Sequence, residues 1–254
     1  TALVSGSTQG IGRAAAIQLA EMGARLILLA RNAEKLKEVV IELKSISDLD
    51  HRFYVADFSN PEEVKEAITT VAAECGAIEI LVNNTGGPPG GKAIDADVDE
   101  YRSAFEMHLV CNQLLVQGLV EGMKEKGYGR IVNVISTSVK QPLQNLGVSN
   151  TIRGAVANWA KTLSLELGEF GITVNNVLPG ATATGRLDAI AERKSEATGK
   201  TVGDVLKSMG DAVPMRRVAQ PAEVANGICF LASPAASYIN GINLPVDGGR
   251  TGSL

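Results

Sequence analysis

A glycine-rich turn near the start of the chain constrains its fold more than any other feature. The segment from Ser5 to Gly12 reads Ser-Gly-Ser-Thr-Gln-Gly-Ile-Gly, and it follows a short apolar run. Apolar residues then recur at Ala15, Leu19 and Met22, a spacing that keeps one face of a helix apolar. The order of strand, glycine turn and helix predicts the first unit of an α/β fold.

The same turn is suited to binding a phosphate. Glycines let the backbone turn sharply and approach an anion, and the free N–H groups of the first helical turn point towards it. Glycine-rich turns are also common without any ligand. Because this one lies between a strand and a helix, we expect a dinucleotide site.

Size and composition favour one α/β domain and exclude several other classes. The chain has 254 residues, a net charge of −4 and 4% aromatic residues. We therefore expect a single domain over residues 1–254, with no nucleic-acid partner. No apolar run approaches the ~18 residues that span a bilayer, so we expect no membrane partner.

The cysteines and histidines predict neither disulfides nor a metal site. Cys75, Cys111 and Cys229 are far apart in the sequence and form no C-x-x-C pair. This usage is typical of reduced thiols in the cytoplasm, where we place the protein. His51 and His108 are the two histidines, and neither has metal-ligand spacing.

The end of the second expected strand, residues 25–30, bears on the choice of cofactor. Arg31 follows this strand about 20 residues after the glycine turn, and no acid lies between the end of the strand and Glu34. In dinucleotide folds an acid here binds the ribose 2′-hydroxyl, whereas an arginine can pair with a 2′-phosphate. We therefore favour NADP(H), while NAD(H) stays open, as does a simple solvent-exposed role for Arg31.

Strands and helices alternate along the rest of the chain. This alternation predicts a Rossmann-type, doubly wound parallel sheet in three layers, with ligands beyond the carboxyl ends of the strands. Long helices are expected over residues 99–126 and 147–169. Residues 185–210 are polar and only thinly apolar, a composition that suits a two-helix lid over a substrate.

Several motifs occur in a fixed order along the sequence. The glycine turn matches T-G-x-x-x-G-x-G, and residues 83–86 read Asn-Asn-Thr-Gly in place of N-N-A-G. Ser136 follows the fifth expected strand, residues 179–184 match P-G-x-x-x-T, and residues 246–249 read Val-Asp-Gly-Gly. Together they resemble the short-chain dehydrogenase/reductase family over essentially the full chain. Within that family, the resemblance is greatest to the 3-oxoacyl-carrier-protein reductase type.

The resemblance implies an oxidoreductase that takes a small carbonyl or alcohol substrate. It also implies a homotetramer or homodimer built through the two long helices. With Arg31 added, the cofactor-binding residues are expected to be Ser5, Gly6, Ser7, Thr8, Gly10, Ile11, Gly12, Arg31, Asp57, Asn84, Thr85, Gly86, Arg153, Pro179, Gly180, Thr182 and Thr184.

The catalytic positions depart from the family pattern. Members of the family use an asparagine, a serine and a Tyr-x-x-x-Lys pair, in which the tyrosine exchanges a proton with the substrate oxygen. Counting on from Ser136, the tyrosine and lysine positions hold Ser149 and Arg153, and the asparagine position holds His108. The spacing of four still places Ser149 and Arg153 on one helical face.

These substitutions change the chemistry that the site can perform. A serine hydroxyl is a poor proton donor, and an arginine stays protonated but can bind ribose hydroxyls and stabilise negative charge. His108 has the ordinary pKa of a general acid, and Lys140 is a further candidate. Each has a structural alternative: His108 lies among apolar residues and could be a core residue, and Lys140 could be a solvent-exposed residue of the loop after the fifth expected strand. We name Ser136, Ser149, Arg153 and His108 as candidate catalytic residues.

Three functions remain open at this point. The first, which we favour, is an NADP(H)-dependent oxidoreductase with an atypical proton pathway. The second is a dinucleotide-binding protein without redox turnover, acting as a sensor or a partner subunit. The third keeps the fold but performs a non-redox reaction, such as that of a lyase or an epimerase.

Overall fold

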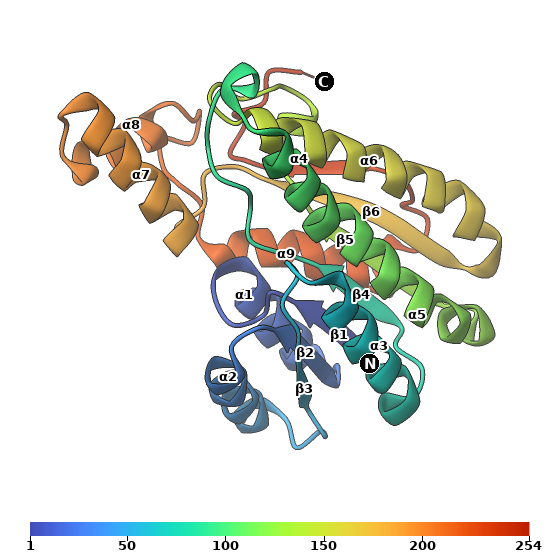
Figure 1. Cartoon of the computed structure of the whole chain (residues 1–254). Coiled ribbons are helices and arrows are strands. Elements are labelled where there is room, and N and C mark those ends of the chain that lie inside the picture. The colour runs from blue at the N-terminus through green and yellow to red at the C-terminus, as the bar shows by residue number, and fades with distance from the viewer. Residues whose placement is uncertain (254) are drawn as a thin grey trace.

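A computed structural model describes residues 1–253 as one seven-stranded parallel sheet with helices on both faces (Figure 1). The strand order is β3-β2-β1-β4-β5-β6-β7, so the chain crosses over between β3 and β4. This confirms the predicted Rossmann-type fold. The strands are β1 (Ala2–Ser5), β2 (Leu26–Ala30), β3 (Arg52–Val55), β4 (Ile80–Asn83), β5 (Gly129–Val134), β6 (Ile172–Pro179) and β7 (Asn243–Val246).

The helices form the two outer layers. Helices α1, α2 and α9 cover one face of the sheet, and α3, α5 and α6 cover the other (Figure 1). Their bounds are α1 (Gly10–Glu21), α2 (Ala33–Ile46), α3 (Pro61–Cys75), α4 (Val98–Phe105), α5 (Cys111–Lys126), α6 (Gly147–Leu167), α7 (Gly185–Thr198), α8 (Val202–Asp211) and α9 (Pro221–Ala232).

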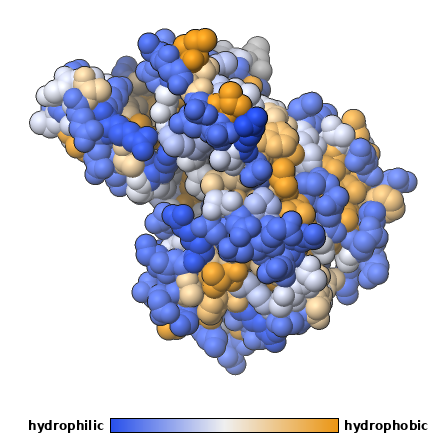
Figure 2. All heavy atoms as spheres, viewed as in Figure 1, coloured by the Kyte–Doolittle hydropathy of each residue, from blue (hydrophilic) through white to orange (hydrophobic). Residues whose placement is uncertain are grey.

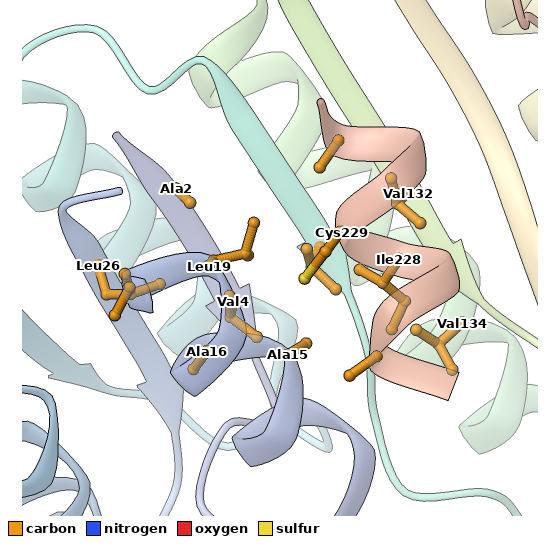
Figure 3. Close-up of a cluster of buried hydrophobic side chains, with 14 of the residues drawn as sticks. Ala2, Val4, Ala15, Ala16, Leu19, Leu26, Val132, Val134, Ile228 and Cys229 are labelled. Carbon is orange, nitrogen blue, oxygen red and sulfur yellow. The ribbon is translucent and has the colours of Figure 1, made fainter. Parts of the chain in front are cut away.

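The central strands are buried on both faces, which explains why they read as continuous apolar runs. In β1, the side chains of Ala2 and Val4 join the core beneath α1 and α9, where Ile228 and Cys229 of α9 also lie (Figure 3). Leu3 of the same strand belongs to the core on the opposite face. The alternation of side chains along a strand thus divides one apolar sequence between two cores.

A row of asparagines, three of them buried, joins strands β4 to β7 by side-chain hydrogen bonds. Asn133 of β5 accepts a hydrogen bond from Asn83 of β4 at 2.8 Å and donates one to Asn176 of β6 at 2.9 Å. Asn176 in turn donates to Asn243 of β7 at 2.9 Å. These residues are paired neighbours in the parallel register. The row therefore fixes the register of four neighbouring strands, and it begins at Asn83, the last residue of β4.

The long helix expected over residues 99–126 is interrupted. A π-helical turn over Glu106–Val110 separates α4 from α5 and contains His108. One extra residue per turn hardly alters the apolar pattern, so periodicity does not reveal it. Such turns often occur at functional sites, because they redirect a side chain.

Two helices, α7 and α8, occupy the segment expected to form a lid. They stand out from the body of the molecule (Figures 1 and 2). Asn60 precedes α3 but does not cap the helix with its side chain. Its amide donates instead to Glu63, whose other carboxylate oxygen accepts from the N–H of Asp57. Among residues 1–253, no helix combines the length and apolar character needed to cross a bilayer.

Candidate active site

The glycine turn has a conformation that excludes side chains. Gly6 and Gly10 have φ values of 58° and 53°, in the left-handed region that favours glycine. A Cβ at Gly6 would collide with the backbone oxygen of Asn84, and one at Gly12 would collide with the oxygen of Gly6. The turn therefore packs backbone against backbone at the carboxyl end of β1.

Asn84 holds this turn in place from the neighbouring strand. Its side-chain amide donates to the backbone oxygen of Gly6 at 3.1 Å, and its N–H donates to the Ser5 hydroxyl at 2.9 Å. Ser5 in turn donates to the Asn84 oxygen at 3.0 Å. The motif after β4 therefore supports the motif after β1, which explains why both are needed for one site.

Groups that an anion can bind lie free at this turn. The start of α1 has no side-chain cap and no acidic residue in its first turn, so the N–H groups of that turn are available. The hydroxyl of Ser7 is fully buried and has no hydrogen-bond partner among the described residues. The arrangement fits a dinucleotide pyrophosphate, whose oxygens accept such hydrogen bonds.

The motif over residues 179–184 lies against the same turn. The methyl group of Thr184 would lie 3.0 Å from a Cβ placed on Gly10, and the Thr182 hydroxyl donates to the Gly180 oxygen at 3.1 Å. A Cβ on Gly180 would lie 2.8 Å from the Cα of Asp247. Three motifs spread over the whole chain therefore meet at one end of the sheet.

Arg31 and Asp57 meet at the ends of β2 and β3. Their side chains form an ion pair at 3.9 Å, and the Arg31 side chain is 79% exposed. Hydrogen bonds from the N–H and hydroxyl of Ser59, with the nearby charge of Arg31, lower the pKa of Asp57. The Arg31 guanidinium is thus held at the sheet edge with most of its donors facing solvent.

The catalytic candidates Ser136, Ser149 and Arg153 gather around the end of β5. Ser136 caps a short 3₁₀ turn, accepting from the N–H of Ser138 at 3.1 Å. Arg153 is buried in α6 and donates to the Val134 oxygen at 3.1 Å. Ser149 lies one helical turn before Arg153 and is half-buried.

Arg153 remains a cation in this position. Burial, and to a smaller extent the charge of Arg186, lower its pKa to about 10, which still leaves it protonated at neutral pH. Its guanidinium uses one donor on Val134, and several others remain for a ligand. The position expected to hold the cofactor ribose therefore carries a fixed positive charge.

His108 does not match the proton donor that its residue type suggests. Its Nδ1 lies 2.7 Å from the Thr85 hydroxyl, and only 1% of its surface is exposed. Burial first, then the charges of Arg153 and Arg186, lower its pKa to about 2. The imidazole is therefore neutral at pH 7, which corrects the expectation that it acts as a protonated general acid.

Two buried polar atoms near these residues have no partner among the described residues. They are Nε2 of His108 and the hydroxyl of Ser138. Both residues are more than nine-tenths buried.

An open hollow of about 440 Å³ lies between the loops that carry residues 92–93 and 143–147, at the start of α6. The described residues contain no group of three His, Cys, Asp or Glu arranged to hold a metal ion.

Sequence reasoning missed Arg186. It lies in the first turn of α7, two residues after Thr184, and its guanidinium donates to the backbone oxygen of Pro88 at 2.5 Å. This contact joins the lid segment to the loop after β4, across 98 residues of sequence. One feature of the sequence could have drawn attention to Arg186: it is a basic residue in the first turn of an expected helix, where the helix dipole favours acidic residues.

Comparison with known proteins covers nearly the whole chain. Residues 6–251 match the family described as Enoyl-(Acyl carrier protein) reductase. A Streptomyces coelicolor protein assigned as a ketoacyl reductase is 33% identical over 98% of this chain and 95% of its own length. The 3-oxoacyl-[acyl-carrier-protein] reductase of Vibrio cholerae is 31% identical over 98% of this chain and 96% of its own length.

A solved structure shows the same architecture. The L-sorbose reductase of Gluconobacter frateurii, solved with NADPH and L-sorbose, is 32% identical and has a TM-score of 0.94. The match covers 100% of this chain and 97% of that protein.

Proposed function

The chain belongs to the short-chain dehydrogenase/reductase family, and we propose that it transfers a hydride between NADP(H) and the carbonyl or alcohol group of a small molecule. The observation that carries this proposal is the side-chain-free turn at Gly6 and Gly12, with the buried cation Arg153 at the end of β5. The turn would bind a phosphate group. Arg153 would place a positive charge beside the substrate oxygen, on which negative charge develops during hydride transfer.

The residues at the turn would hold the pyrophosphate of the cofactor. Main-chain N–H groups at the start of α1 and the buried Ser7 hydroxyl supply the hydrogen bonds, and no acidic side chain opposes them in the first turn. Asn84 keeps the turn closed from the opposite side. Thr182 and Thr184, whose hydroxyls now donate to the backbone oxygens of Gly180 and Thr182, would contact the nicotinamide half of the cofactor.

Arg31 supports NADP(H) over NAD(H). Its exposed guanidinium stands at the end of β2 with Asp57 as its partner, and a 2′-phosphate would add a second anion within its reach. An arginine suits a phosphate because its donors form a planar fork. The relative from Gluconobacter, solved with NADPH, is consistent with this choice.

Three residues of this chain would stabilise the negative charge that develops on the substrate oxygen. The bound nicotinamide supplies or accepts the hydride. The hydroxyls of Ser136 and Ser149 would donate hydrogen bonds to the substrate oxygen, while Arg153 stabilises its developing negative charge. Arg153 also takes the place of the lysine that holds the ribose in other members of the family.

The proton would follow a different route from that in family members with a tyrosine. The Ser149 hydroxyl is a poor proton donor by itself, and the neutral His108 lacks the acidic proton of an imidazolium. We propose that water or Lys140, in the turn after Ser138, delivers the proton through the Ser149 hydroxyl. His108 is then a hydrogen-bonding residue that positions Thr85.

A specific observation also supports the second function, a dinucleotide-binding protein without redox turnover. Neither the tyrosine nor the lysine of the family is present, and the usual acid is therefore missing. The third function, that of a non-redox lyase or epimerase, draws no additional support from the site. The experiment below separates all three.

The test is consumption of NADPH over a panel of small ketones and oxoacids, with product mass as a second readout. A product heavier by two hydrogens supports the proposal, and loss of rate in Ser136→Ala, Ser149→Ala and Arg153→Ala assigns it to this site. Tight NADPH binding without turnover would favour the second function. A product of unchanged redox state would favour the third.

We also propose that the protein assembles as a homodimer or homotetramer in the cytoplasm. The supporting observation is Leu165 on α6, a large apolar side chain that is 75% exposed. The three cysteines are buried and unpaired, which fits a reducing compartment.

A further inference from the structure

Two arginines approach the catalytic residues without any acidic partner. Arg153 is 7% exposed, and Arg186 is half-buried. Neither takes part in an ion pair among residues 1–253. Each donates one hydrogen bond to a backbone oxygen, on Val134 and Pro88 respectively, which leaves most of their guanidinium donors for other groups.

The charges that shift the pKa values of His108, Arg153 and Arg186 are all positive. Arg186 is close enough to lower the pKa of both Arg153 and His108, and Arg193 lowers that of Arg186. No carboxylate contributes to any of these three shifts. Withdrawing a cation from water is costly unless a counter-charge is present. Residues 1–253 supply no ion-pair partner for either arginine, so a ligand is the expected source of that counter-charge.

The position of Arg186 separates it from the phosphate-binding turn. Thr184, two residues earlier, faces Gly10 in that turn. The Arg186 guanidinium instead lies against residues 87–88, with its Nη2 3.5 Å from the place of a Cβ on Gly87. That loop follows Thr85, the hydrogen-bond partner of His108. Arg186 therefore faces the side of the cleft where the catalytic residues lie.

We propose that Arg186 binds an anionic group of the substrate, either a carboxylate or a phosphate, next to the carbonyl that is reduced. This inference rests on the proposed oxidoreductase function and narrows its substrate to small anionic carbonyl compounds. The planar guanidinium suits both groups, because each presents two oxygens to parallel donors.

The contact between Arg186 and Pro88 adds a geometric reason. It holds the first turn of α7 against the loop after β4, so an anion bound there would contact the lid and the body together. Binding energy from this group, which does not itself react, can then favour the arrangement in which the catalytic residues enclose the substrate.

Binding to the NADP⁺-loaded protein tests the proposal, because the oxidised cofactor cannot reduce a ketone. Three probes differ only in the group beside the carbonyl: pyruvate, acetylphosphonate and the neutral pyruvamide. Calorimetry should show that pyruvate or acetylphosphonate binds at least about tenfold more tightly than pyruvamide. Which anion binds more tightly identifies the group.

Variants then assign the preference to one side chain. Arg186→Ala should remove the preference for the anions and leave the affinity for NADP⁺ unchanged, while Arg186→Lys should retain part of it. Arg193→Ala, which removes an exposed arginine from the same helix, should keep the preference. Unchanged NADP⁺ affinity also shows that the variants are folded.

Four results would overturn the inference. In the wild type, these are equal binding of pyruvamide and the anions, or no binding of any probe. In Arg186→Ala, they are a preserved preference for the anions, or a loss of NADP⁺ affinity. The last result would assign Arg186 to the cofactor phosphates. Absence of NADP⁺ and NADPH binding by the wild type would refute the proposed function itself and is thereby distinguished from these results.

Discussion

The hydroxyl of Thr85 lies 2.7 Å from Nδ1 of His108, so two departures from the family pattern are partners of one another. Thr85 replaces the alanine of N-N-A-G, and His108 occupies the asparagine position in the helix. An alanine at residue 85 would leave Nδ1 of a buried imidazole without this bond. The two positions are therefore coupled, and their effects should be measured together.

The burial of His108 predicts a specific dependence of stability on pH. Its pKa in the folded protein is about 2, well below the ordinary value near 6.5 in the unfolded chain. The unfolded state therefore binds the proton first, and stability is lost as the pH falls below about 6.5. Between pH 7.5 and pH 5.0 this residue should cost about 2 kcal/mol in the free energy of unfolding.

Urea unfolding of the wild type and of His108→Asn at the two pH values measures this effect. The variant should lose about 2 kcal/mol less than the wild type over the same interval. His51, whose pKa is also lowered by burial, contributes with the same sign in both proteins and cancels in the comparison. Parallel pH profiles of the two proteins would contradict the neutral, buried imidazole.

Replacing Arg31 should change the choice between the two nicotinamide cofactors. Arg31→Ala removes the guanidinium from the end of β2, and its affinity for NADPH should fall by about tenfold or more, while its affinity for NADH stays within a small factor. Fluorescence titration with both cofactors provides the measurement. Arg102→Ala, which removes an exposed arginine paired with Asp99 on α4, is the control and should change neither affinity. An equal loss for both cofactors would argue against a 2′-phosphate contact.

A single methyl group at Gly12 should abolish cofactor binding. Its Cβ would overlap the backbone oxygen of Gly6, so the turn would have to open. Gly12→Ala should therefore lose detectable affinity for NADPH. Gly203→Ala is the matched control, because Gly203 is exposed in α8 and a Cβ there meets only the Thr201 hydroxyl at 3.8 Å. That variant should bind NADPH normally and gain about 0.5–1 kcal/mol in helix stability. Normal binding by Gly12→Ala would show that the turn is not the phosphate site.

The sequence predicts the sheet and the phosphate turn because their signals are local. A buried parallel strand is a continuous apolar run, and a side-chain-free turn requires glycine at fixed positions such as Gly6 and Gly12. Each of these signals is contained within one short stretch of sequence. The wound topology then follows from the alternation of strands and helices.

The catalytic side of the cleft could not be predicted in the same way. The pKa of His108 depends on burial by the fold and on charges from α6 and α7, which no spacing reveals. Arg186 contacts Pro88, which lies 98 positions earlier in the sequence, only once the chain between them has folded. The π turn over residues 106–110 also leaves the apolar pattern nearly intact. Residue type alone therefore suggested an acid where the structure places a neutral hydrogen-bonding group.

Association of copies through α6 predicts the effect of one surface charge. Leu165 is 75% exposed on that helix, and an aspartate there would place a charge within the expected interface. Leu165→Asp should shift the protein to a smaller species in light scattering, with unchanged circular dichroism. Ile41→Asp on α2, where Ile41 is 69% exposed on the other face of the sheet, should leave the mass unchanged. A wild type that is already monomeric would refute the proposed assembly.

The asparagine row across β4 to β7 should make Asn133 important for stability out of proportion to its size. Asn133 is fully buried, accepts from Asn83 and donates to Asn176, so Asn133→Ala leaves a donor and an acceptor without partners. Each such group costs about 1–3 kcal/mol, and the variant should lose about 2–6 kcal/mol in urea unfolding. Asn226→Ala, at an exposed position on α9, should change stability by less than about 0.5 kcal/mol. Because the row ends at Asn83, next to Asn84 and the glycine turn, Asn133→Ala should also weaken NADPH binding at temperatures where it is still folded. A loss of stability with unchanged NADPH affinity would show that the row supports the sheet alone.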